Sequence, residues 1–238
     1  MRIALISDIH GNQVALEAVL EHIAHQHAAV DTLVIAGDLC LNGPRPREVL
    51  ETLQALHCPV VQGNVDVDVI KQRPKKGTKK RDIVDWTREQ IGEVGLNYLD
   101  RLPTSHLVAN PDGTDVLVVH ANPLNQEDTI FPTASDKELE RLLGDVPATT
   151  GIVAFGHLHI AYRRQWRDLL LFDIGSCGLP RDEDHRASYG VLTWQDGVWQ
   201  GEHHRVEYDV PRVVEQLRAC GMPHIEKRIK ILLEARYS

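Results

Sequence analysis

Five short polar motifs carry side chains that could bind metal ions, and each of them follows a short apolar segment. The motifs are Asp8-Ile9-His10, Gly37-Asp38, Gly63-Asn64-Val65-Asp66, His120 and Gly156-His157-Leu158-His159. Leaving Asp66 aside, they offer two carboxylates, one amide and four imidazoles, and no thiolate. This donor set suits a hard or borderline divalent ion such as Mn²⁺, Fe²⁺, Ni²⁺, Co²⁺ or Zn²⁺, and it argues against a structural cysteine-rich zinc site.

Seven donors are too many for one tetrahedral ion, whereas they suit two ions that share a bridging carboxylate. Two metal ions about 3.5–4 Å apart can stabilise both the attacking and the leaving oxygen of an in-line phosphoryl displacement. The donor set therefore favours hydrolysis of a phosphate ester at a dinuclear site.

The apolar segments that precede the motifs are predicted to be buried strands, namely 2–6, 32–36, 60–62, 116–119 and 152–155. In open α/β sheets, the side chains beyond the carboxyl ends of the strands converge on one crevice. Residues two apart in an extended segment face the same way, which predicts Asp8 with His10, and His157 with His159, as chelating pairs. The glycines before the ligands, Gly37, Gly63 and Gly156, are expected to allow tight turns into the site.

The segments between these strands predict an α/β fold. A helix capped by Asn12 follows the first strand, and a helix opened by Pro46 follows the second, so parallel pairing with right-handed crossovers is expected. The turn Pro111-Asp112-Gly113 predicts a hairpin, and the strands after 152–155 read as mostly antiparallel. Helices are expected at 211–220 and 225–235. Two sheets packed face to face, with helices outside, would bury these elements as one domain over residues 1–238, with the C-terminal helices of 211–238 packed on it.

Composition narrows the class of protein. The chain has 238 residues, 42% of them hydrophobic and 25% charged, which is ordinary for a globular protein with one core. A formal charge of -8 excludes a generally basic nucleic-acid coat protein. Four cysteines without a CxxC pair read as reduced thiols, and no apolar run approaches the ~20 residues of a membrane span. Because an acid at Asp8 leaves no room for a secretory leader, we predict a cytoplasmic enzyme without a membrane partner.

The ordered set D-x-H, G-D, G-N-x-D, H, G-H-x-H resembles the calcineurin-like metallophosphoesterase superfamily. The segments GDLCLNGP at 37–44, GSCGLPR at 175–181 and RASY at 186–189 resemble its small bacterial and archaeal members of phosphodiesterase type, so the resemblance spans roughly residues 1–210. It implies a four-layer α/β/β/α sandwich of two mixed sheets, as in metallo-dependent phosphatases. It also implies a metal-dependent phosphoric ester hydrolase that acts on a small phosphate ester, with phosphodiesters favoured.

Carried over residue by residue, the resemblance implies two ion sites and a hydroxide between them that attacks phosphorus. The first ion would be held by Asp8, His10, Asp38 and His159, and the second by Asp38, Asn64, His120 and His157, with Asp38 bridging. Asp38 and Asn64 are the expected catalytic residues, since the Asn64 amide could also donate a hydrogen bond to a phosphate oxygen. Asn12 and Arg181 are the expected substrate contacts. Manganese is the favoured metal, with iron, nickel, cobalt, zinc and magnesium as alternatives.

The chain departs from many members of the family at Val65, where they carry a histidine that is thought to protonate the leaving group. Valine transfers no proton, which weighs modestly against substrates with poor leaving groups. The alternatives are a phosphomonoesterase or protein-phosphatase-like enzyme, a dinucleoside polyphosphate hydrolase, and a non-catalytic protein-interaction scaffold of the same fold.

Residues 71–81 contain seven basic residues and no acidic one. The run reads either as a solvated loop or as an anion-collecting lip, since it begins five residues after Asp66. A nucleic-acid substrate is not favoured, because no aromatic residues interleave the run to stack bases.

Overall fold

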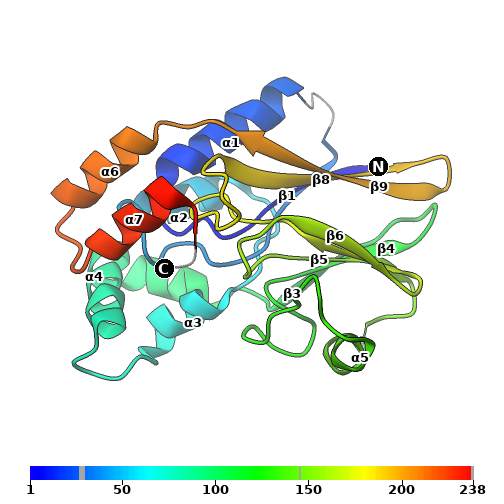
Figure 1. The fold of residues 1–238 in the computed structure, drawn as a ribbon, viewed down its shortest axis with the longest axis horizontal. Helices are drawn as coiled ribbons and strands as arrows, with labels where there is room; N and C mark the ends of the chain where they lie inside the picture. The colour runs from blue at the N-terminus through cyan, green and yellow to red at the C-terminus, as the bar shows by residue number, and fades with distance from the viewer. Residues whose placement is uncertain (27–29, 145, 237–238) are drawn as a thin grey trace.

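Two β-sheets stack face to face in the computed structural model, which describes residues 1–26, 30–144 and 146–236 (Figure 1). The first sheet has the strand order β2-β1-β8-β9. Its strands are β1 (Arg2–Ile6), β2 (Thr32–Ile35), β8 (Ala187–Gln195) and β9 (Val198–Val206). Because β1 pairs parallel with β2 and antiparallel with β8, this sheet is mixed.

The second sheet has the order β3-β4-β5-β7-β6. Its strands are β3 (Ser105–Val108), β4 (Asp115–Val119), β5 (Thr150–Phe155), β6 (Tyr162–Trp166) and β7 (Leu169–Asp173). The three central strands β4, β5 and β7 run parallel, and each edge strand pairs antiparallel with its neighbour. The carboxyl ends of β4 and β5 therefore lie at the same edge of this sheet.

Helices cover the outer face of each sheet. They are α1 (Gln13–Gln26), α2 (Pro46–Leu56), α3 (Asn64–Lys71), α4 (Lys79–Asp100), α5 (Asp136–Leu143), α6 (Val210–Ala219) and α7 (Glu226–Glu234). Alternate residues of β1 divide the core: Ile3 and Leu5 pack between the sheets, whereas Ala4 and Ile6 pack against the helices. Leu139 of α5 packs on the far side of the second sheet. The predicted four-layer α/β/β/α sandwich of two mixed sheets is confirmed.

Two local predictions need correction. The predicted strand 60–62 is reduced to one parallel bridge between Val60 and Ile35, because the chain turns at Gly63 into α3. The helix α3 was not predicted, since its alternating Val and Asp residues carry no helical period; it is initiated instead by the Asp66 carboxylate, which accepts the Gly63 N–H at 2.9 Å. Residues 237–238 of the predicted C-terminal segment lie outside the described residues. Among the described residues, no helix combines the length and the apolar character needed to cross a bilayer.

Candidate metal centre

The seven predicted ligands come together where strands of both sheets end. Asp8 and His10 follow β1, and Asp38 follows β2, all from the first sheet. His120 follows β4, while His157 and His159 follow β5, all from the second sheet. Asn64 is the first residue of α3. The site is therefore built across the seam between the two sheets.

One group of side chains consists of Asp8, His10, Asp38 and His159, whose ligand atoms all lie within 4.8 Å of one another. Asp8 Oδ1 is 3.1 Å from His159 Nε2, and His10 Nε2 is 3.6 Å from Asp38 Oδ2. All four side chains are buried. Four ligand atoms this close together could hold one divalent cation.

A second group lies on the other side of Asp38. His120 Nε2 is 3.3 Å from Asp38 Oδ1 and 3.0 Å from Asn64 Oδ1. His157 Nδ1 is 3.2 Å from both Asn64 Oδ1 and His120 Nε2. The two oxygens of the Asp38 carboxylate therefore face different groups, which is the arrangement that a bridging ligand requires.

Backbone carbonyls hold the outer nitrogens of two imidazole rings, so that their inner nitrogens face the site. His10 Nδ1 donates to the Leu41 carbonyl at 2.8 Å, and His159 Nδ1 donates to the Leu179 carbonyl at 2.6 Å. Each ring then directs its Nε2 into the site, and these two nitrogens lie 3.1 Å apart. Asp8 Oδ1 is buried beside them, with no hydrogen-bond partner among the described residues. Two imidazole nitrogens and a carboxylate oxygen that converge in this way could all bind one cation, so the donor set fits a metal.

The backbone at these ligands is strained. The φ angle is 55° at Asp8 and 52° at His10, and it is 69° at His157 and 64° at His159. Asp8 and His10 lie in the same group, as the predicted pair requires, whereas His157 and His159 lie in different groups. The extended geometry that was expected for both pairs is wrong. Residues other than glycine rarely adopt the left-handed region, and such strain is concentrated at functional sites.

Two motif glycines are required because other groups approach them closely. A Cβ on Gly63 would lie 2.2 Å from Asp38 Oδ1, and a Cβ on Gly156 would lie 2.2 Å from Asp8 Oδ2. Only Gly37, of the three glycines singled out, has a positive φ. The chain turns at Gly63 into α3 and at Gly156 after β5, so the close approach, and not a positive φ, is what requires glycine at these two positions.

Asp66 holds the loop that carries Asp38. Its carboxylate accepts the N–H groups of Asp38 at 3.1 Å and Leu39 at 3.0 Å. Burial raises the pKa of Asp66 to about 6, against the lowering effect of its backbone hydrogen bonds. The side chain thus orients a proposed ligand through the backbone.

Burial and charge together shift the ionisation of the ligands. Burial opposes ionisation of Asp8, but the imidazoles, His159 first, hold the pKa of Asp8 well below its ordinary value. Burial, followed by the charges of Asp8 and Asp66, raises the pKa of Asp38 well above its ordinary value. Burial also lowers the pKa of His10, and it lowers that of His157 to about 4. The lowered pKa values of His10 and His157 favour neutral rings at these two positions, which is the state that metal binding needs.

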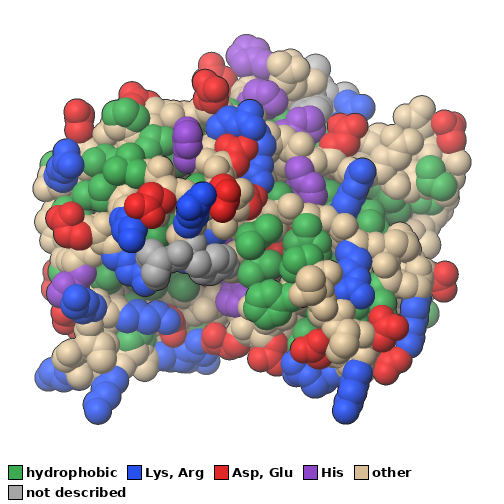
Figure 2. Space-filling view, viewed as in Figure 1, with side chains coloured by type: hydrophobic (Ala, Val, Ile, Leu, Met, Phe, Trp, Pro, Cys, Tyr) green, Lys and Arg blue, Asp and Glu red, His purple; other side chains and the backbone are tan. Residues whose placement is uncertain are grey.

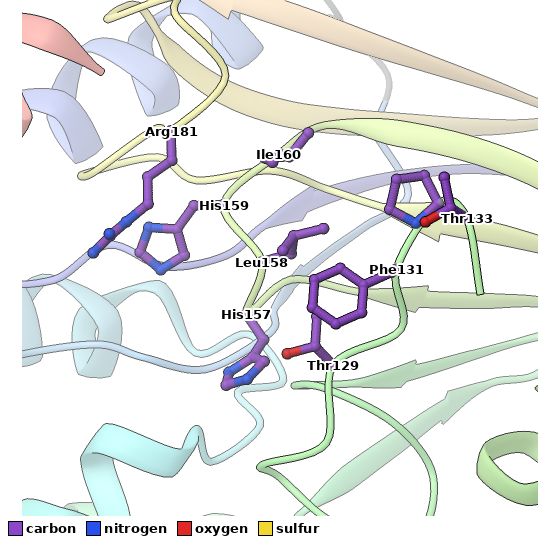
Figure 3. A pocket seen from close by; sticks show the side chains of 9 residues that line it. Thr129, Phe131, Thr133, His157, Leu158, His159, Ile160 and Arg181 are labelled. Atoms are coloured by element: carbon purple, nitrogen blue, oxygen red, sulfur yellow. The ribbon is translucent and has the colours of Figure 1, made fainter. Parts of the chain in front are cut away.

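A cavity of about 610 Å³ opens beside the two groups (Figure 3). His157, Leu158, His159 and Ile160 form one wall, and Phe131 stands opposite them. Arg181 runs past His159, with its guanidinium group directed away from Phe131. The wall formed by residues 129–133 was not predicted, because this loop carries no motif.

Two other sequence predictions have different outcomes. Asn12 caps α1 by accepting the Ala15 N–H, and its amide also donates to the Gly178 carbonyl. Because both ends of the amide are used and the side chain is 2% exposed, we remove Asn12 from the substrate contacts.

Val65 is buried in the core, and its N–H donates to Asp38 Oδ1 at 3.1 Å. Glu127, which was not predicted, contacts both Asn64 and Arg73.

Comparison with known proteins gives a family match and several relatives. The family model described as the calcineurin-like phosphoesterase superfamily domain matches residues 1–197. An uncharacterized protein of Methanocaldococcus jannaschii is 31% identical over 240 residues, which cover 93% of each protein. The crystal structure of a metallophosphoesterase from Sphaerobacter thermophilus matches 99% of both chains, with a TM-score of 0.78 and 27% identity. A symmetrical bis(5'-nucleosyl)-tetraphosphatase of Erwinia tasmaniensis is 29% identical over 147 residues, or 59% of this chain and 51% of that protein.

Proposed function

This chain belongs to the calcineurin-like phosphoesterase superfamily, and on that premise we propose that it hydrolyses organic phosphate esters, with a preference for diesters, at a site that binds two divalent cations. Family membership supports a hydrolase of phosphate esters in general. The binding of two ions and the preference for diesters go beyond family membership and are part of the proposal. Manganese stays the favoured metal, and the cytoplasmic location and the single domain over residues 1–238 stay predictions.

The observation that carries the proposal is the position of the Asp38 carboxylate. One of its oxygens faces His10 at 3.6 Å, and the other faces His120 at 3.3 Å. A carboxylate with a different imidazole at each oxygen is suited to bridge two cations. A single-ion site would leave the group of His120, His157 and Asn64 without a role.

Bound cations would supply Lewis-acid chemistry, by lowering the pKa of a water molecule and by stabilising the charge that develops on phosphoryl oxygens. The protein's part is to fix the ligands. The Leu41 and Leu179 carbonyls orient the rings of His10 and His159, and Asp66 holds the Asp38 loop. The Asn64 Nδ2 group can donate a hydrogen bond to a phosphate oxygen while its Oδ1 faces the imidazoles.

The shape of the cavity supports an organic substituent on the phosphate. Phe131 and Leu158 give it an apolar side next to His157, and Arg181 lies at its other end. A ligand could therefore rest its organic group on Phe131 while its phosphate lies by the imidazoles. Val65 provides no proton for a leaving group, which favours esters whose leaving group departs with little help.

Two alternatives are separated by experiment. Monoester hydrolysis would show as faster turnover of 4-nitrophenyl phosphate than of bis(4-nitrophenyl) phosphate. A non-catalytic scaffold would retain no stoichiometric metal and would hydrolyse neither compound.

The test is to load the purified protein with Mn²⁺, measure bound metal by mass spectrometry, and assay both esters at equal concentration. We expect two ions per chain and a higher kcat/KM for the diester. One ion per chain, or a faster monoester reaction in protein that holds two ions, would contradict the proposal. Ni²⁺, Mg²⁺ and Zn²⁺ serve as the comparison metals.

A further inference from the structure

The loop of residues 122–128, which follows the proposed ligand His120, is held in shape by two of its own asparagines. Asn122 Oδ1 accepts two N–H groups further along the loop, at 2.8 and 2.9 Å. Asn125 Oδ1 in turn accepts the N–H groups of Glu127 at 2.9 Å and Asp128 at 2.8 Å. Side-chain acceptors of this kind fix a turn without a helix or strand. The position of Glu127 is therefore defined by the loop that carries it.

Glu127 reaches two proposed ligands of the second ion. Gln126 Nε2 donates to the Gln62 carbonyl at 2.6 Å, which holds the loop against the segment that leads into α3. At the start of that helix, Asn64 Nδ2 donates to Glu127 Oε2 at 3.5 Å. Burial lowers the pKa of His157, and a hydrogen bond to the Glu127 backbone opposes that shift. The loop thus places a carboxylate beside the group of Asn64, His120 and His157.

Arg73 holds this carboxylate in place from the opposite side. It donates to Glu127 Oε1 and, at 2.8 Å, to Oδ1 of the buried Asp68. Asp68 follows Asn64 by one turn of α3, so the guanidinium group is anchored on the same face of the helix as the amide. One oxygen of Glu127 meets the guanidinium group and the other meets the amide. The negative charge of the pair therefore lies nearer to the metal centre than the positive charge does.

Acidic side chains lie on this side of the candidate metal centre. Figure 2 shows Asp and Glu side chains in the lower middle of the face, between α3 and α5 of Figure 1, with Lys and Arg side chains on either side. Glu127 and Asp128 are the acidic residues of the loop, and the next residue, Thr129, lines the apolar cavity with His157. An ester whose organic group lies in this cavity would have its phosphate close to Glu127.

We propose that Glu127 selects phosphate diesters over phosphate monoesters by its charge. This inference rests on the proposed function, in which the Asn64 amide donates to a phosphate oxygen. The amide nitrogen carries two hydrogens, and one of them is directed at Glu127, so a phosphate oxygen that accepts the other lies close to the carboxylate. A diester has one negative charge, whereas a monoester has about two near neutral pH. The additional charge of the monoester is repelled at this position.

This selection differs in kind from the effect proposed for Val65. The absence of an acid at Val65 acts on the departure of the leaving group, so its effect depends on leaving-group basicity. Repulsion by Glu127 depends on the charge of the phosphate and is screened by salt. Arg73 offsets the repulsion only in part, because it lies behind the carboxylate and shares its charge with Asp68.

The first test compares two esters that share one leaving group, 4-nitrophenyl phosphate and bis(4-nitrophenyl) phosphate. In Glu127→Gln an oxygen can still accept from Asn64, but the charge is gone. We expect kcat/KM for the monoester to rise about three- to tenfold relative to the diester, since repulsion from a side chain that is 49% exposed is partly screened. The control Glu140→Gln breaks a similar exposed pair, with Arg167, and should leave the ratio unchanged. An unchanged ratio in Glu127→Gln would overturn the inference.

Two further measurements separate charge from structure. Added salt should raise the monoester-to-diester ratio more in the wild type than in Glu127→Gln, and equal salt dependence would count against repulsion. The double variant Arg73→Gln, Glu127→Gln should keep part of the gain, because the nearer charge is still removed; loss of the whole gain would assign the effect to a released Arg73 and overturn the inference. Bound metal, measured by mass spectrometry, should match the wild type, and a lower content in Glu127→Gln would show that Glu127 acts on the metal instead.

The last test needs no turnover and distinguishes failure of this inference from failure of the proposed function. Phenylphosphonate and methyl(phenyl)phosphinate, which have no ester bond, are titrated by calorimetry into the Mn²⁺-loaded proteins at a pH where the first is a dianion and the second a monoanion. Glu127→Gln should tighten binding of the dianion about three- to tenfold relative to the monoanion. Equal changes for the two ligands, or no binding of phenylphosphonate to either protein, would overturn the inference even if the diester is hydrolysed. The expected change in a protein that hydrolyses neither ester would retain Glu127 as the selecting charge and reject the proposed function.

Discussion

Substituting the shared carboxylate, Asp38→Asn, should have opposite effects on the metal-free and the metal-loaded protein. Asparagine keeps an oxygen that can accept the Val65 N–H, but it removes the negative charge between the two groups of ligands. In the metal-free chain that charge is unfavourable, because burial and the charges of Asp8 and Asp66 raise the pKa of Asp38. The metal-free variant should therefore melt at or above the temperature of the metal-free wild type.

The metal-loaded proteins should differ in the other direction. Free metal at a hundred times its dissociation constant stabilises a one-site protein by about 2.7 kcal/mol, so two sites contribute roughly 5 kcal/mol. For a chain of this size, 1 kcal/mol shifts Tm by about 2–4 °C, which predicts a metal-induced rise of roughly 10–20 °C in the wild type. Because both groups use Asp38, the variant should lose most of that rise.

The assay is a thermal melt at rising Mn²⁺ concentration, combined with bound metal measured by mass spectrometry. Asp68→Asn is the matched control, since Asp68 is a buried carboxylate 3% exposed that pairs with Arg73 and Lys80 and faces no proposed ligand atom. The control should be less stable with and without metal, and should keep the metal-induced rise. An unchanged rise in Asp38→Asn, or retention of one of two ions, would refute the bridging assignment.

Three further predictions test the surroundings of the site. Gly63→Ala should lower the metal content of the protein, because the new Cβ would lie 2.2 Å from Asp38 Oδ1. Gly144→Ala is the control, since its Cβ would meet only the Glu140 carbonyl at 3.1 Å, and it should leave the metal content unchanged. Equal metal content in the two variants would contradict this prediction. Val65→His should raise kcat/KM more for basic leaving groups than for good ones, by up to about 10²–10⁴-fold for a well-placed acid; parallel plots of log kcat/KM against leaving-group pKa for the two folded proteins would reject a role for Val65. Burial lowers the pKa of His203 from 6.5 to about 4. Between these pH values the unfolded chain binds more protons than the folded chain, so the free energy of unfolding falls as the pH falls. The contribution of this group is roughly 3 kcal/mol. His203→Gln should remove that part of the slope in urea titrations at pH 4–7, and an unchanged slope would count against the shift.

The sequence predicts the parts of the fold whose signal is local. Each of the segments before Asp8, Asp38, His120 and His157 forms a strand, because short apolar runs bounded by polar residues have few other stable arrangements. The carboxyl ends of such strands meet, which is enough to bring the ligands near one another. The spacing of the ligands therefore predicts where they lie.

The orientation of the ligand side chains depends on tertiary contacts, so it could not be predicted from the spacing of the ligands. The positive φ angles of Asp8 and His10 are held by hydrogen bonds from their N–H groups to Gly37 and Asp38, residues nearly 30 positions away. The tautomer of His159 is set by the Leu179 carbonyl, which arrives from a loop 20 residues later.

Each proposed ion would take its ligands from both sheets. Asp8, His10 and Asp38 come from the first sheet and would share an ion with His159 of the second. His120 and His157 of the second sheet reach back to Asp38 of the first. Each ion would thus bind residues of both sheets at their seam. The free energy of metal binding, and not packing of the core, would then offset the strain of the positive φ angles at the ligand residues. The core between the sheets, which includes Leu5 and Val118, is built from apolar side chains, so packing holds the scaffold while the left-handed ligands lie at the seam.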